Sequence, residues 1–196
     1  MGALRGEKMP ARIPKGHPLV RLFANLTEEN FAGHLGWPDG EVIGYLTDIL
    51  TDFVHIDQLF KIRNAQGRRV EEVAEMLAEG DLLHRAESVE REREVHKHIG
   101  DYTLFMTGIF PEFLRRLKTS KVMISPDALL DYIQMGKRSY RIVSEFTYGP
   151  YGESAPLFRK LAENFELCVY GLGYVRADLD RLRDPRFQAL KGRLLG

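Results

Sequence analysis

The sequence predicts an all-α protein: a single-domain bundle of about five to seven helices around a buried central helix at about residues 95–117. Three observations lead to this prediction. Several segments place apolar residues at alternating spacings of four and three, which is the period of a packed helix. No segment alternates apolar and polar residues as a half-buried strand does. A length of 196 residues with 44% hydrophobic residues suits one domain with a sizeable core.

Residues 1–16 are expected to form a flexible basic arm. They hold two prolines, three glycines and four basic residues against one acid, without an apolar period. The bundle domain is expected at residues 17–185. It begins with one or two short helices in residues 17–35, and glycine and proline then interrupt the chain at residues 36–40.

Residues 41–62 carry a regular apolar stripe and predict one long amphipathic helix, capped by Asp39. Asp48, Asp52 and His55 share one flank of this helix. Two carboxylates and a histidine at such spacing could hold a metal ion. No apolar residue interrupts the flank, however, so a solvated face is the favoured interpretation.

The central helix is predicted from residues 99–114, where apolar residues fall on nearly every side of a helical wheel. A helix that is apolar all round is surrounded by others. The charge-rich run that follows Asp81 is expected to form its exposed front half. Pro111 cannot donate a hydrogen bond within a helix, so we expect a break near Phe110, with Pro111 in the first position of a short second piece.

A stripe of ionisable residues runs beside the most apolar turns of the central helix. It consists of Glu94, His98, Asp101 and Glu112. One hypothesis is a metal site completed by an acid of the last helix, such as Glu163 or Glu166, because ferritin-like bundles place carboxylate ligands in this way. The chain lacks the paired Glu-x-x-His motifs of those bundles. The favoured interpretation is structural, with the first two residues solvated, Asp101 bonded to a hydroxyl or a basic group, and Glu112 near the restarted helix's N-terminus.

Two further long helices are predicted, at about residues 126–146 and 154–184. A capping hydroxyl, a proline and an acid at residues 125–127 start the first one. Cys168 lies on the apolar stripe of the second, where a thiol packs far more often than it reacts. After this helix, residues 186–196 are expected to form a short basic tail.

A ligand pocket within the bundle is one function that the pattern suggests. Its lining would consist of Asp101, Gly108, Gly136, Tyr140 and Gly171. Missing side chains can leave a cavity between helices, and Gly171 and Gly173 also weaken their helix, which suggests contact with a neighbour's backbone or a bound group. The alternative at each glycine is tight helix packing.

Composition limits the partners and the compartment. Basic and acidic residues are equal at 28 each, which favours neither nucleic acid nor an anionic membrane surface. No apolar run is long enough to cross a bilayer, and the single cysteine fits a reducing cytoplasm. No cofactor is predicted, because no phosphate-binding glycine loop, serine elbow or zinc-protease motif is present. A homodimer remains an open expectation, because apolar faces run along four helices.

Three segments, HIGDYTLFMTGIFPEFL, YIQMGKRSYRIVSEF and FELCVYGLGYVR, together resemble an uncharacterised family of bacterial all-helical proteins. The resemblance extends over most of the chain from about Val20 onward. It implies a single helical domain in a bacterial cytoplasm, and it supplies no catalytic residues because that family has no assigned activity. The sequence therefore predicts a non-enzymatic protein that binds an unidentified small molecule or protein, with a metal-binding or enzymatic bundle as the alternative.

Overall fold

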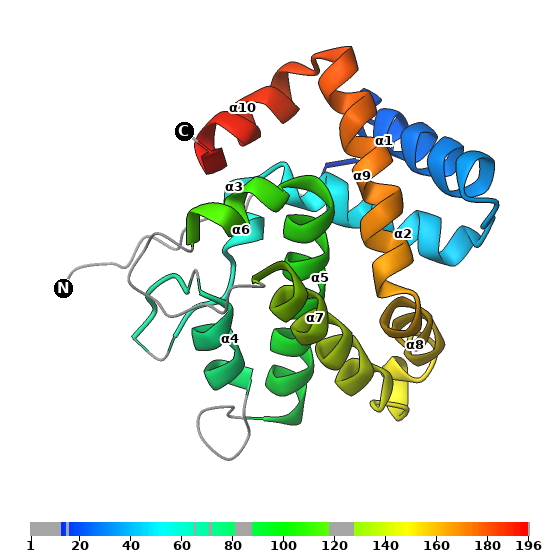
Figure 1. The fold of residues 1–196 in the computed structure, drawn as a ribbon. Helices are drawn as coiled ribbons and strands as arrows, with labels where there is room; N and C mark the ends of the chain where they lie inside the picture. The colour runs from blue at the N-terminus through cyan, green and yellow to red at the C-terminus, as the bar shows by residue number, and fades with distance from the viewer. Residues whose placement is uncertain are drawn as a thin grey trace.

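A computed structural model describes residues 13–14, 16–64, 66–70, 72–80, 88–117 and 128–195. These residues form ten α-helices, a π-helical turn at Glu29–His34 and a 3-10 turn at Gly149–Tyr151, and none of them forms a strand (Figure 1). The helices are α1 Pro18–Glu28, α2 Gly40–Phe53, α3 Ile56–Leu59, α4 Val73–Gly80, α5 Val89–Ile109, α6 Pro111–Leu117, α7 Ala128–Ser144, α8 Ala155–Glu163, α9 Phe165–Leu182 and α10 Pro185–Leu195. The predicted all-α fold is confirmed.

The α-helices outnumber the five to seven expected, because two predicted helices are each divided in two and α10 forms where a tail was predicted. The helix expected at residues 41–62 ends at Phe53, since His55 adopts an extended backbone (φ −90°, ψ 113°) before α3. The helix expected at residues 154–184 breaks at Asn164. The side-chain amide of Asn164 donates to the Lys160 carbonyl at 3.0 Å, a local bond of the kind that competes with helix continuation.

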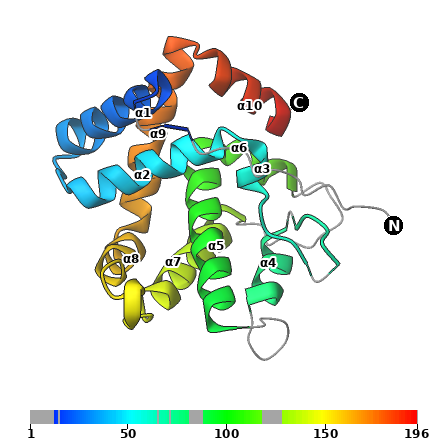
Figure 2. The ribbon, with the colours of Figure 1, turned by 180° about the vertical axis from the view of Figure 1, so that it is seen from behind.

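Helix α5 is the centre of the bundle, and it packs chiefly against α4, α7 and α9 (Figures 1 and 2). Every residue from Val95 to Ile109 except Lys97 is buried. The Ser88 hydroxyl caps the helix by accepting from the Arg91 amide at 3.1 Å. The helix stops after Ile109 and Pro111 begins α6, so the predicted break is confirmed.

The C-terminal segment is a packed helix, and the prediction of a short basic tail at residues 186–196 was wrong. In α10 the side chain of Phe187 is buried and stacks on Phe110 with ring centroids 5.5 Å apart. The Asp184 carboxylate accepts from the amides of Arg186 and Phe187, each at 3.0 Å. An Asp-Pro pair that ends one helix therefore also supplies the cap and the first residue of the next.

Other predictions fall partly outside the described residues. Most of the arm at residues 1–16, the charged run at residues 81–87 and the helix start at residues 125–127 lie there. Among the helices that are described, none is long and apolar enough to cross a bilayer.

Candidate functional site

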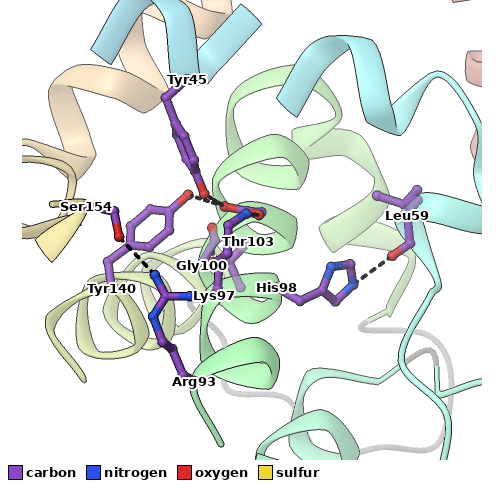
Figure 3. A network of polar contacts seen from close by, with 10 residues as sticks. Tyr45, Leu59, Arg93, Lys97, His98, Gly100, Thr103, Tyr140 and Ser154 are labelled. Carbon is purple, nitrogen blue, oxygen red and sulfur yellow. Dashed lines mark hydrogen bonds and ion pairs between the residues drawn. The ribbon is translucent and has the colours of Figure 1, made fainter. Parts of the chain in front are cut away.

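A buried carboxylate lies where three helices meet. Asp101 of α5 accepts through Oδ1 from the Tyr45 hydroxyl of α2 at 2.5 Å and from the Tyr140 hydroxyl of α7 at 2.9 Å (Figure 3). Its Oδ2 accepts from the Lys97 ammonium at 2.7 Å. The expectation that Asp101 bonds to a hydroxyl or a basic group is confirmed, and both kinds of donor are present.

A glycine makes this meeting of helices possible. An added Cβ at Gly100 would overlap the ring of Tyr140, so only glycine lets that ring lie against α5 at this level. Lys97 stands four residues before Asp101, the spacing at which helical side chains meet. Tyr45 is held from the other side by an edge-to-face contact with Phe158, with ring centroids 5.4 Å apart.

The two tyrosines are donors in this network and are not poised for proton transfer. Burial raises the pKa of Tyr45 and of Tyr140 well above the usual value of 10, and the nearby charge of Asp101 raises both further. Both hydroxyls therefore keep their protons at neutral pH. With three donors on one carboxylate, the network joins α2, α5 and α7.

The four residues of the predicted metal site go to different partners. Glu94 pairs with Arg91 at 3.4 Å, Glu112 pairs with Arg176, and Asp101 belongs to the tyrosine network. Within the described part of the chain no three His, Cys, Asp or Glu residues come close enough to hold a metal ion. The members of this stripe therefore do not converge on one site among the described residues, because the break at Pro111 and the coverage of α5 send them in different directions.

His98 is buried, and the expectation that it is solvated was wrong. Its Nε2 lies 3.1 Å from the Leu59 carbonyl, which can only accept, so Nε2 carries the proton. Its Nδ1 is buried without a hydrogen-bond partner. Burial, followed by the charge of Lys61, lowers the pKa of His98 to about 3. The ring is therefore neutral, and it packs against Phe53 with centroids 5.8 Å apart.

The glycines predicted to line a pocket are sites of close packing. An added Cβ at Gly108 would lie 2.6 Å from the Cβ of Leu172, and one at Gly171 would overlap the ring of Phe31. At Gly136 it would overlap Phe165 and Thr103. The three glycines thus face different neighbours. The packing alternative holds at each of them.

An open groove of about 470 Å³ lies between α9 and the junction of α5 and α6. Its walls include Gly108, Pro111, Val169, Gly173 and Ala177. Tyr170 and Tyr174 border it, and they are 58% and 38% exposed. Their hydroxyls lie 2.7 Å apart and bond to each other. Gly108 therefore has two roles, since its buried side packs on Leu172 while its backbone borders the groove.

Sequence reasoning missed several residues of these sites. Lys97 could have been found from its spacing to Asp101, and Tyr170 and Tyr174 from their place beside Gly173. No signal pointed to Arg93, whose guanidinium lies 4.2 Å from the ring centroid of Tyr151 and donates to the Ser154 hydroxyl at 3.0 Å.

Comparison of the chain with protein-family models, with curated proteins and with solved structures gave no match.

Proposed function

We propose that this protein is a non-enzymatic binding protein of the cytoplasm that binds a helix of a protein partner along the outward side of α9. The observation that carries the proposal is the pair of exposed tyrosines, Tyr170 and Tyr174, beside an apolar groove. The buried thiol of Cys168, whose pKa burial raises to about 12, agrees with a reducing compartment.

The chemistry of the groove suits a protein partner. Tyrosine is enriched in protein interfaces because its ring offers a large apolar area and its hydroxyl a polar contact, at little cost in conformational entropy. Here two such rings stand one helical turn apart. Between them and α5 lie small residues, Gly173 and Ala177, which leave room for the apolar ridge of another helix.

The hydrogen-bond network around Asp101 also supports a non-enzymatic function. The carboxylate of Asp101 accepts three hydrogen bonds, and the tyrosines that contact it stay protonated. The Nδ1 atom of His98 faces the protein interior. The contacts of Asp101 join three helices, and this structural role requires no reaction.

Hydroxyl-radical footprinting of the tyrosines tests the proposal. Tyr170 and Tyr148 have similar exposure, 58% and 51%, so dilute purified protein should be oxidised at both. In an extract of the producing cells at the native concentration, Tyr170 should be protected severalfold while Tyr148 reacts as before. Equal oxidation of both tyrosines in the extract would show that α9 faces solvent in the cell and would defeat the proposal.

A pair of glycine variants provides the matched control. An added Cβ at Gly173 or at Gly192 meets no heavy atom within 4 Å, and both glycines lie in helices. Gly173→Gln fills the groove and should abolish the protection of Tyr170, whereas Gly192→Gln on α10 should leave it intact. Protection that survives Gly173→Gln would place the contact elsewhere.

A further inference from the structure

We infer that the helix bound along the outward side of α9 is the α9 of a second copy of this chain, packed antiparallel about a two-fold axis between Gly173 and Tyr174. This inference rests on the proposed function and specifies its partner. The sizes and charges of the residues along α9 support it.

The outward side of α9 is a single continuous stripe. It consists of Glu166, Tyr170, Gly173, Tyr174, Ala177 and Arg181. The opposite side of the same helix is buried through Phe165, Cys168 and Val175. Figures 1 and 2 place α1 and α2 behind α9, and the stripe is exposed apart from half-buried Gly173, with the ring of His34 against that of Tyr174. A second helix can therefore approach along the whole length of the stripe.

The stripe is complementary to itself in size. With the axis between Gly173 and Tyr174, Tyr170 of one copy lies opposite Ala177 of the other, and Tyr174 lies opposite Gly173. Each large ring thus meets a small residue, the arrangement that lets the ridges of two helices interlock. The space around Gly173 is open, so a tyrosine ring can lie against its backbone. In a two-fold interface each of these contacts occurs twice.

The stripe is also complementary in charge. The same register places Glu166 of one copy opposite Arg181 of the other at both ends of the pair. Sliding one helix by a turn separates these charges, so they select the register. Within the single chain, Glu166 pairs with Lys137 at 2.6 Å and Arg181 pairs with Asp178 at 2.7 Å. Both are surface pairs of little energetic weight, and their outer members can bridge to a second copy.

The expected dimer is weak and reversible. The stripe from Glu166 to Arg181 is about 22 Å long, at 1.5 Å per residue. One pair of helices of this length buries less than the roughly 800 Å² per partner of a stable interface. We therefore expect dissociation in the micromolar range.

Sedimentation equilibrium of the full chain with reversed charges tests the register. The wild type should dimerise, and Glu166→Arg or Arg181→Glu should each raise Kd by about tenfold or more, because like charges then face each other. The double variant Glu166→Arg/Arg181→Glu should return Kd to within about threefold of the wild type. Unchanged thermal midpoints at dilute concentration would show that the monomer fold is intact in all three variants.

Gly173→Gln should abolish the dimer, whereas Gly192→Gln should not. A wild type that stays monomeric at all concentrations overturns the inference, although protection of Tyr170 in the extract would still uphold the proposed function with another partner. A dimer that still forms in Gly173→Gln would use a different surface, and this result would also overturn the inference. Failure of the double variant to recover the affinity lost in the single variants would refute the antiparallel register.

Discussion

The junction at Asp101 and the outward side of α9 use the same residue types, tyrosine beside glycine, in opposite ways. At the junction the ring of Tyr140 covers Gly100 and its hydroxyl is fixed by Asp101. On α9 the rings of Tyr170 and Tyr174 flank Gly173, whose side-chain space is open, and their hydroxyls bond only to each other among the described residues. Gly100, which the ring of Tyr140 covers, therefore contributes to the packing of the fold. Gly173, which no side chain covers, leaves space for a binding partner.

The largest effect is expected where the glycine is covered. Gly100→Ala should lower the free energy of unfolding by about 4 kcal/mol, because the added methyl displaces the Tyr140 ring and breaks its bond to Asp101. Urea unfolding followed by circular dichroism measures this loss. A change below about 1 kcal/mol would mean that the ring moves aside freely and that the two regions differ less than their geometry suggests.

Asp101→Ala tests the other half of the junction. It leaves the buried hydroxyls of Tyr45 and Tyr140 without their acceptor and should lower the free energy of unfolding by about 3 kcal/mol. Asp48→Ala on the exposed side of α2 is the control, with a change within about 0.5 kcal/mol. A stabilised Asp101→Ala variant would instead reveal a carboxylate kept for binding or chemistry.

The buried histidine predicts a pH dependence. The unfolded chain protonates His98 near pH 6.5, whereas the folded chain does so only near its pKa of about 3. Stability therefore falls as pH falls through this window, by about 2 kcal/mol between pH 7.5 and 5. When the free energy of unfolding is measured by urea across this pH range, it should depend less on pH in His98→Gln than in the wild type. His34→Gln, at an exposed histidine against Tyr174, should keep the wild-type slope.

The smallest effect concerns two glycines on one groove. Gly173→Ala should raise the free energy of unfolding of the dilute monomer by about 0.5–1 kcal/mol, because it fills empty space and favours helix. Gly108→Ala should lower it, since the new methyl would lie 2.6 Å from the Cβ of Leu172. Thermal unfolding decides the signs. If both variants changed stability in the same direction, the distinction between covered and uncovered glycines would not hold.

Sequence patterns predicted the fold class and much of its order. The apolar stripes located the main helices, and Pro111 located the break after α5. The breaks at His55 and Asn164 were missed because the apolar period continues through both, whereas the backbone turns extended at His55 and the Asn164 side chain bonds to the Lys160 carbonyl. Helix α10 was missed because Asp184-Pro185 reads as an end as readily as a start.

The candidate site was less predictable, because its members come from separate elements. The kinds of partner of Asp101 could be anticipated from the need to satisfy a buried charge. Tyr45 could not be chosen in advance, since nothing local says which helix lies across from α5. The same limit applies to Gly108 and Gly173, which look alike in sequence and differ only in what lies opposite.

The reactivity of the Cys168 thiol measures how often the core beside α9 opens. Cys168 is the only cysteine in the sequence, and its thiol is buried on the side of α9 opposite Gly173. A thiol reagent can reach it only after the packing around Cys168 opens, so the alkylation rate reports how often the core beside α9 opens. A helix bound on the outward side would hold α9 in place. Binding on the outward side should therefore slow the alkylation of Cys168, and the bound fraction can be followed without a label on the surface itself.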